Sequence, residues 1–291
     1  MSSPWLQAVR PKTLSMAVIP VLLGAVVAHT ESALFKPLLL SLVLLAALLI
    51  QIGTNLYNDV GDAERGADGP DRLGPKRMVA AGVLSAGSVR KAAILSFFGA
   101  FVIGVALVVV GGLPIIFIGL SSIAAGIAYT GGRLPIAYTF MGELFVFLFF
   151  GVVAVMGTTY LITLQWSSTA LLVGSVIGLL AAAVLVVNNY RDIDTDRAVG
   201  KNTLAVTLGA ALTRVLYLTL LLTPFLVLLV LSEQLQKPLL IWVMMPALPV
   251  SLYLGRKIYL LPHGRGLNQL LAQTAQLQLL FGILMMFGLY L

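Results

Sequence analysis

The sequence predicts an all-α integral membrane protein in which about nine transmembrane helices form one bundle, with residues 1–291 as a single domain. Three observations predict this fold class. Hydrophobic residues make up 59% of the chain and charged residues only 10%, whereas a soluble domain carries about 25% charged residues. Apolar segments of spanning length recur along the chain, and nearly all basic residues lie in alternate connections between them.

A spanning helix needs about 20 mostly apolar residues. The expected spans are 13–30, 37–57, 92–111, 113–131, 140–162, 169–190, 213–231, 239–255 and 269–291. The first span has an alternative interpretation as a signal peptide, because basic residues precede its apolar run. It lacks a small-x-small cleavage site and further spans follow it, so it is expected to remain as a helix.

The basic residues indicate how the bundle is oriented. If the N-terminus is cytoplasmic, only Lys36 and Lys237 of the 18 Lys and Arg residues fall in outer connections. The others, Arg10 and Arg191 among them, fall on the cytoplasmic side, as the positive-inside rule requires. The net charge of +7 therefore indicates membrane orientation and not nucleic-acid binding.

Acidic residues gather on the same side, which the orientation rule does not explain. One motif, at 55–62, closes the second span, and another, at 188–196, closes the sixth. An offset of 133 residues aligns Asn55 with Asn188, whereas an offset of 130 aligns Asn58 with Asn188, and the sequence leaves both registers open. In either register, two acidic helix ends recur as expected if two halves of a bundle face each other.

Such clusters of carboxylates repel one another unless cations intervene. Cysteine is absent and the two histidines are far apart in the chain, so oxygen atoms must hold any metal, and this favours Mg²⁺. Mg²⁺ ions between two facing clusters would bind a diphosphate and make it a better leaving group. With an allylic substrate, departure of the diphosphate would leave a resonance-stabilised carbocation, and the apolar bundle interior would shelter it. The alternative is that these are solvated loop acids beside basic partners, but their recurrence at two helix ends favours the metal site.

Basic and aromatic residues near the motifs are candidates for substrate contacts. Arg72 and Arg77 lie in a loop with Gly and Pro spacing after the first motif, and Lys201 follows the second. They are suited to diphosphate oxygens, although simple orientation charge is the alternative. Arg133 and Tyr138, in a later cytoplasmic connection, are candidates for the carboxylate or hydroxyl groups of an acceptor.

Glu143 is the acidic residue nearest the interior of a span. An ionisable residue inside a membrane is a functional candidate by default. Its place only a few residues into the fifth span equally allows an interfacial role, so both interpretations stay open.

These motifs resemble those of the UbiA-type aromatic prenyltransferase superfamily. That family has an Asn-x-x-x-Asp-x-x-x-Asp motif after its second helix and an Asp-x-x-x-Asp motif after its sixth. Asn58 and Asp62 match the first motif, and Asp192 and Asp196 match the second. The third position of the first motif is Gly66, and Asp68 is the candidate for its role.

Further stretches resemble the 1,4-dihydroxy-2-naphthoate polyprenyltransferase branch of this superfamily. They are Arg10-Pro-Lys12-Thr-Leu, Asn58-Asp-Val-Gly-Asp62, Arg72-x-Gly-Pro, Tyr129-Thr-Gly-Gly-Arg133, Gly142-Glu-Leu-Phe, Asn189-x-Arg-Asp-Ile-Asp and Gly200-Lys-Asn-Thr-Leu-Ala. The likeness covers the chain up to about residue 209, and the last three spans add little.

The resemblance implies a bacterial plasma-membrane enzyme of menaquinone synthesis that joins a polyprenyl diphosphate to 1,4-dihydroxy-2-naphthoate and releases diphosphate and CO₂. The implied catalytic residues are Asp62, Asp192 and Asp196. The implied Mg²⁺ ligands are Asn58, Asp59, Asp62, Asp68, Asp192 and Asp196. The implied substrate-binding residues are Arg72, Arg77, Lys201, Arg133, Tyr138, Glu143 and Lys12.

Two alternatives remain at this stage. Within the enzyme class, 4-hydroxybenzoate or homogentisate is another possible acceptor. A cation-coupled transporter is the alternative from another class, but it predicts ionisable residues near the middle of spans, and here the acids gather at one edge. The Asp-Gly-x-x-Ala-Arg run of membrane phosphatidyl-type transferases is absent.

Overall fold

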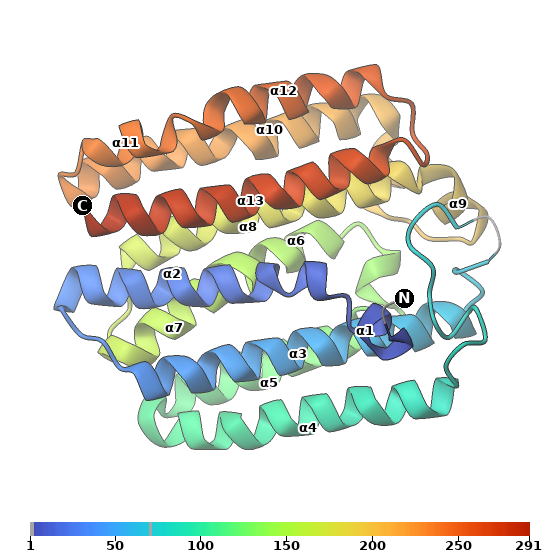
Figure 1. Ribbon diagram of the computed structural model, residues 1–291, viewed down its shortest axis with the longest axis horizontal. Helices are drawn as coiled ribbons and strands as arrows, with labels where there is room; N and C mark the ends of the chain where they lie inside the picture. Colours follow the sequence, from blue (N-terminus) through green and yellow to red (C-terminus); the bar gives the residue numbers. More distant parts are fainter. Residues whose placement is uncertain (1–2, 70–71) are drawn as a thin grey trace.

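The computed structural model describes residues 3–69 and 72–291, and every regular element in that part of the chain is a helix. The elements are α1 (Pro4–Val9), η1 (Pro11–Thr13), α2 (Ser15–Ser32), α3 (Pro37–Glu64), α4 (Ala86–Gly111), α5 (Leu113–Ala128), η2 (Ile136–Tyr138), α6 (Gly142–Phe147), η3 (Leu148–Val152), α7 (Val153–Thr163), α8 (Ser168–Arg191), α9 (Ile193–Ala198), α10 (Leu204–Leu235), α11 (Leu239–Met244), α12 (Ala247–Leu260) and α13 (Leu267–Tyr290). The long helices run side by side along the longest axis of the molecule (Figure 1).

Within the described residues, seven helical segments are long and apolar enough to cross a membrane. They are Ser15–Ser32, Pro37–Glu64, Ala86–Gly111, Gly142–Thr163, Ser168–Arg191, Leu204–Leu235 and Leu267–Tyr290. Two expected spans differ from this set. Helix α5 has only 16 residues, and the span expected at 239–255 is divided into α11 and α12 at Pro246, where the missing N–H interrupts the helical ladder. The prediction of an all-α multi-pass membrane bundle is confirmed.

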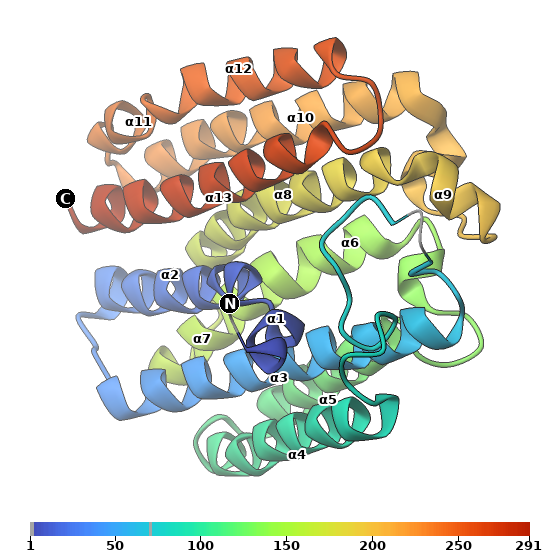
Figure 2. The same ribbon diagram turned by 45° about the vertical axis from the view of Figure 1, so that its right-hand side comes forward.

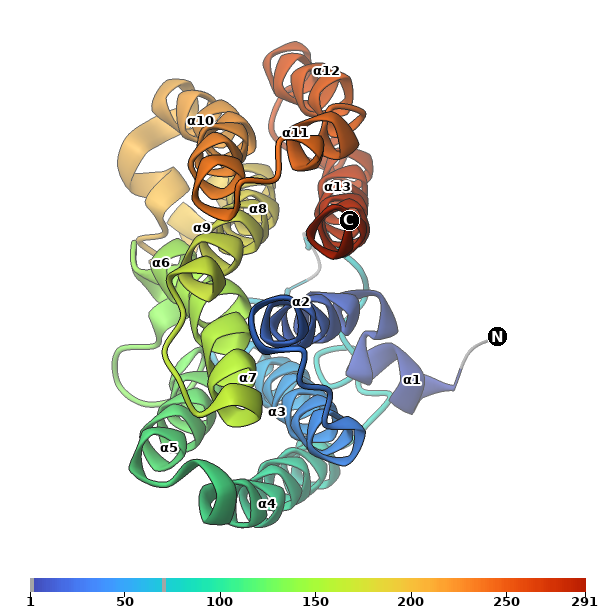
Figure 3. The same cartoon turned by 90° about the vertical axis from the view of Figure 1, so that its left-hand side faces the viewer.

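Helix α8 lies at the centre of one side of the bundle, in contact with α10, α13 and the α6–η3 segment (Figure 3). Its crossing with η3 depends on glycines, because a Cβ atom on Gly151 would lie 2.4 Å from the backbone of both Gly174 and Gly178. Helices in lipid associate through such close packing, since lipid supplies no hydrophobic force between them. The crossing coincides with the π-helical turn η3.

Helix α2 joins this side to the other side of the bundle, which is formed by α3, α4, α5 and α7. It packs against α7 and α13, and the hydroxyl of Thr159 donates a hydrogen bond of 2.9 Å to the carbonyl of Gly24.

The C-terminal ends of α3 and α8 lie at the same end of the bundle, with α9 and the 65–85 loop (Figures 1 and 2). We call this the polar end. The α2–α3 and α10–α11 connections, which carry Lys36 and Lys237, lie at the opposite end (Figure 1). The two acidic motifs, far apart in the sequence, are therefore brought together at one end of the fold.

Candidate active site

A cavity of about 670 Å³ extends from the polar end into the bundle, between α2, α3, α4, α5, α7 and α8. Its mouth is lined by charged and amide side chains: Arg10, Asn55, Asn58, Asp62, Arg72, Arg77, Asn188, Asn189, Arg191, Asp192, Asp196 and Lys201. Beyond the mouth the lining is mostly apolar and includes Ile50, Val105, Leu107, Ile115 and Leu161. The cavity therefore combines a polar mouth with a hydrophobic chamber that reaches the α4–α5 connection.

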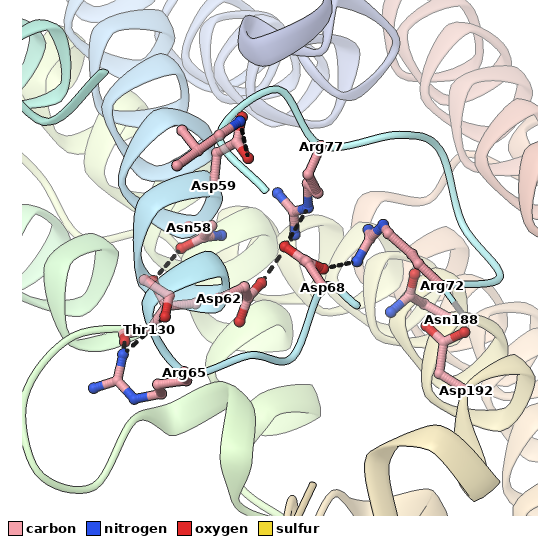
Figure 4. Close-up of polar contacts among 12 residues, drawn as sticks. Asn58, Asp59, Asp62, Arg65, Asp68, Arg72, Arg77, Thr130, Asn188 and Asp192 are labelled. Carbon is pink, nitrogen blue, oxygen red and sulfur yellow. Dashed lines mark hydrogen bonds and ion pairs between the residues drawn. The ribbon is translucent and has the colours of Figure 1, made fainter. Parts of the chain in front are cut away.

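Asn58 is held at the mouth by the α5–η2 connection. Its Oδ1 accepts a hydrogen bond of 2.8 Å from the hydroxyl of Thr130 (Figure 4). The guanidinium of Arg65 donates to the carbonyls of Thr130 at 2.6 Å and Gly132 at 2.7 Å. These hydrogen bonds fix the C-terminal end of α3 to the α5–η2 connection.

Asp62, one helical turn after Asn58, is surrounded by donors. Its Oδ2 lies 3.0 Å from Nη2 of Arg77, and its Oδ1 accepts a hydrogen bond of 3.1 Å from the hydroxyl of Tyr138. The Nζ of Lys201 lies 3.8 Å from the same Oδ1. Three candidate substrate-binding residues thus meet at one candidate metal ligand.

The side chain of Asp59 points away from the cavity. Its carboxylate accepts hydrogen bonds from the backbone N–H groups of Met78 at 3.2 Å and Val79 at 3.4 Å, and it does not line the cavity. Because successive residues of an α-helix are rotated by about 100°, Asp59 cannot share a face with Asn58. The structure therefore does not bring Asp59 together with the other candidate metal ligands.

The second motif forms the facing wall. Asn188 and Asp192 of the α8 end line the cavity opposite Asn58 and Asp62 (Figure 4). The structure thus favours the offset of 130 residues between the two motifs. The side chain of Asp194, in contrast, is 66% exposed and does not line the cavity. Its Oδ2 lies 2.7 Å from Nε2 of His263.

Two buried carboxyl groups at the mouth have raised pKa values. Burial raises the pKa of Asp196 to about 6, although Lys201, whose Nζ is 3.6 Å away, opposes the shift. Burial likewise raises the pKa of Asp68 to about 6, opposed mainly by Arg72. Asp68 is bonded to Arg72 and lies 3.4 Å from Nε of Arg77. It therefore sits close to the first motif, where a third acidic residue was expected.

The donor set at the mouth suits Mg²⁺, because it consists of carboxylate and amide oxygens. In the part of the chain that the structure describes, no three acidic or histidine side chains are close enough to hold an ion by themselves. Mg²⁺ is commonly held by one or two carboxylates together with phosphate oxygens of a substrate. The geometry therefore fits an ion that binds together with a diphosphate.

The other candidate substrate contacts fall into two groups. Arg72, Arg77 and Lys201 line the mouth. Tyr138 lies beside it, with its hydroxyl bonded to Asp62 and its ring centroid 4.6 Å from Nζ of Lys201. Arg133 and Lys12 are exposed and do not line the cavity. The structure does not bring these last two to the site.

Glu143 is buried beside the cavity wall. Its Oε1 accepts a hydrogen bond of 2.8 Å from Nδ2 of Asn189, which does line the cavity. Its Oε2 is buried and has no hydrogen-bond partner within residues 3–69 and 72–291.

Two arginines that line the mouth, Arg10 and Arg191, were not among the candidate substrate contacts, because their charge was attributed to the orientation of the protein in the membrane. Arg10 has a left-handed backbone (φ 56°), a conformation that is costly for a residue with a side chain. Arg10 caps the C-terminus of α1, and the amide of Asn55 holds the residues on either side of it, because it donates to the carbonyl of Val9 at 2.8 Å and to the hydroxyl of Thr13 at 3.0 Å. In the sequence, the stretch Arg10-Pro-Lys12-Thr-Leu, which resembles the prenyltransferase branch, was the signal that could have marked it.

Arg10 has a guanidinium nitrogen suited to an anion. Among the residues that the structure describes, its Nη2 is buried without a hydrogen-bond partner, and Arg10 lines the cavity. Burial lowers the pKa of Arg10, with a further contribution from Arg72, yet a guanidinium stays charged in proteins.

Comparison with known proteins agrees with this geometry. The chain is 41% identical over 211 residues to a 1,4-dihydroxy-2-naphthoate octaprenyltransferase of Escherichia coli, covering 70% of this chain and 68% of the relative. It is 35% identical over 292 residues to the enzyme of the same name from Haemophilus influenzae, covering 98% and 95%. A UbiA homolog from Archaeoglobus fulgidus, solved with GPP and Mg²⁺, has a similar fold, with a TM-score of 0.73 at 15% identity over 99% of this chain and 100% of that one. The model of the UbiA prenyltransferase family matches residues 17–286, and the chain belongs to that family.

Proposed function

We propose that this protein transfers a polyprenyl chain from its diphosphate to 1,4-dihydroxy-2-naphthoate, with release of diphosphate and CO₂. The observation that carries the proposal is the cavity itself, in which Asp62 and Asp192 face each other at the mouth of an otherwise apolar chamber. The names of the relatives from Escherichia coli and Haemophilus influenzae support this acceptor.

The mouth supplies the diphosphate site in this proposal. Arg72, Arg77 and Lys201 bind the phosphate oxygens, with the two arginines suited to bidentate contacts. Asn58, Asp62, Asp68, Asp192 and Asp196 are the residues that would hold Mg²⁺. Bound there, Mg²⁺ neutralises the charge that develops on the departing diphosphate.

The chamber supplies the site for the prenyl chain. Its apolar lining along α3, α4, α5 and α7 excludes water from the allylic carbon, and a dry site also strengthens the charge interactions at the mouth. The residues that carry charge stay at the mouth, next to the bond that breaks.

The acceptor carries a carboxylate, which needs a cation that the diphosphate does not occupy. Arg72 and Arg77 are assigned to the diphosphate, and Arg191 is paired with Asp192, whereas Nη2 of Arg10 is buried without a hydrogen-bond partner among the described residues. We assign Arg10 to the acceptor carboxylate and the hydroxyl of Tyr138 to an acceptor hydroxyl group.

The reaction balances without an external reagent. The ring carbon that bears the carboxylate forms a bond to the allylic carbon while the carbon–oxygen bond to diphosphate breaks. Loss of CO₂ returns its bonding electron pair to the ring, which gives demethylmenaquinol. The chain's task is therefore to hold two anionic substrates side by side and to keep water out.

The bacterial relatives support a bacterial inner-membrane location, and the distribution of charge supports a cytoplasmic N-terminus. The polar end holds nearly all basic residues, as expected for the cytoplasmic side. Both water-soluble groups, the diphosphate and the aromatic acid, would then enter from the cytoplasm.

The test is mass spectrometry of the product formed by purified protein with Mg²⁺, geranylgeranyl diphosphate and 1,4-dihydroxy-2-naphthoate. A prenylated naphthoquinol without the carboxylate, absent when EDTA is added, is the expected result. A product formed only with 4-hydroxybenzoate or homogentisate would contradict the assigned acceptor, and no product with any of the three would contradict the proposed reaction.

A further inference from the structure

Asn268 brings the last long helix into the active site. It is the second residue of α13, which contains neither acidic motif. Its Oδ1 accepts a hydrogen bond of 2.9 Å from Nη1 of Arg191, and its Nδ2 donates one of 2.9 Å to the carbonyl of Leu73. A guanidinium only donates and a carbonyl only accepts, so the two partners fix the orientation of the Asn268 amide.

Arg191 is fully engaged in this arrangement. It is buried, with 3% of its side chain exposed. Its Nε donates to Oδ1 of Asp192 at 2.7 Å, and its Nη2 donates to Oδ1 of Asn188 at 3.0 Å. Each of its three nitrogens therefore has an acceptor, so Arg191 is suited to orient Asp192 and not to bind a phosphate itself.

The segment 72–77 contacts both Arg191 and Asn268. A Cβ atom on Gly74 would lie 3.0 Å from Nη2 of Arg191, so glycine allows the backbone to approach the guanidinium closely. The same segment carries Arg72 and Arg77, which are bonded to Asp68 and Asp62. One asparagine thus touches both sides of the mouth, the metal-binding side through Arg191 and the phosphate-binding side through Leu73.

We propose that Asn268 is a positioning residue of the prenyl diphosphate site, which orients Asp192 through Arg191 and fixes the segment 72–77 through the carbonyl of Leu73. This inference rests on the proposed function, because it assumes that Asp192 binds the metal and that Arg72 and Arg77 bind the diphosphate. Asn268 touches neither substrate in this account.

Two substitutions separate the two contacts. Asn268→Ala removes both of them. Asn268→Asp keeps an oxygen acceptor for Arg191 but removes the donor to Leu73. Gln269→Ala is the matched control, since Gln269 is the exposed neighbour on the same helix turn.

The measurement is equilibrium binding of a non-reactive geranylgeranyl thiolodiphosphate at varied Mg²⁺, together with backbone hydrogen exchange of the segment 72–77. For Asn268→Ala we expect the dissociation constant and the Mg²⁺ concentration for half-maximal binding each to rise about 5- to 30-fold, because two hydrogen bonds are lost. For Asn268→Asp we expect weaker binding and faster exchange with a nearly unchanged Mg²⁺ requirement. Gln269→Ala should match the wild type in all three.

The inference is overturned if Asn268→Ala binds the analogue with wild-type affinity and Mg²⁺ requirement, or if Asn268→Asp raises the Mg²⁺ requirement as much as Asn268→Ala does. A melting temperature lowered in both variants without a change in binding also overturns it, because that is the result of a structural contact alone. Binding needs no acceptor and no turnover. Failure of the proposed reaction, which product analysis of the wild type detects, is therefore distinguishable from failure of this inference.

Discussion

The Nζ of Lys201 lies 3.8 Å from Oδ1 of Asp62 and links the region after the second acidic motif to the first. The same ammonium lies 3.6 Å from Asp196 and 4.6 Å from the ring centroid of Tyr138. A single lysine thus occupies the space between the two walls of the mouth, where the diphosphate is proposed to bind. In the proposed function, its partners would change from carboxylates to phosphate oxygens when metal and diphosphate bind.

Replacing Lys201 should therefore weaken substrate binding selectively. We expect Lys201→Gln to raise KM for the prenyl diphosphate about 10- to 100-fold, as expected for loss of a hydrogen bond to a charged group, with a smaller effect in Lys201→Arg. Steady-state kinetics with each substrate varied in turn would measure this. Lys76→Gln is the control, because Lys76 is exposed and does not line the cavity. An equal rise in KM for the acceptor would contradict the assignment.

Asp62 and Asp192 should be essential. We expect Asp62→Asn and Asp192→Asn each to lower kcat by about 100-fold or more, because each removes a negative charge from the proposed Mg²⁺ site. Asp194→Asn, which changes an exposed acid of the same motif, should retain activity. Single-turnover assays at saturating Mg²⁺ would measure the loss, and full activity in either cavity variant would refute the metal assignment.

The local sequence predicted the two faces that carry the site, because residues four apart share a helix face. Asn58 with Asp62 and Asn188 with Asp192 follow this rule and do line the cavity. Asp59, expected beside them as a metal ligand, does not line the cavity, and helical periodicity turns it away from Asn58. Its actual partners, two backbone N–H groups, lie in a loop whose course no periodicity predicts.

The cations were harder to predict, because a membrane protein has many basic residues on one side for orientation alone. Arg10 and Arg191 have the charge pattern of that background, although both stand in stretches that resemble the prenyltransferase branch. The structure distinguishes them, because Nη2 of Arg10 and the side chain of Arg191 are buried at the mouth. Asn268 gives no signal at all, because its contact with Leu73 joins the first turn of α13 to a loop that is far away in the chain. Packing of α13 beside α8 creates this contact.

The Mg²⁺ requirement should depend on pH. The pKa values of Asp68 and Asp196 are both raised to about 6 by burial, and protons compete with Mg²⁺ for carboxylate oxygens. As the pH falls from 7.5 through 6, these groups take up protons, and we expect the Mg²⁺ concentration for half-maximal activity to rise. Mg²⁺ titrations at a series of pH values would show this. In Asp196→Asn the dependence should be weaker, and a requirement that fell at low pH would have the wrong sign.

Arg10 should select for the acid group of the acceptor. We expect Arg10→Gln to raise KM for 1,4-dihydroxy-2-naphthoate about 10- to 100-fold, because a charge-assisted hydrogen bond is lost. KM for the prenyl diphosphate should change little. Binding of 1,4-naphthalenediol, which lacks the carboxylate, should be unaffected by the substitution. Lys12→Gln, at an exposed position two residues away, is the control, and equal losses for both ligands would contradict the assignment.

Gly104 offers a test of where the prenyl chain lies. It lines the cavity within α4, and a Cβ atom there would meet nothing within 4 Å. Gly104→Leu therefore adds side-chain volume inside the chamber without displacing the backbone, and leucine also favours helix more than glycine does. We expect kcat/KM for octaprenyl diphosphate to fall about 5-fold or more relative to geranyl diphosphate, as overpacking of an apolar site predicts. Gly87→Leu, at an exposed position of the same helix that also has open space, should leave the ratio unchanged. A loss that is equal for both chain lengths would show that the distal chain does not pass Gly104.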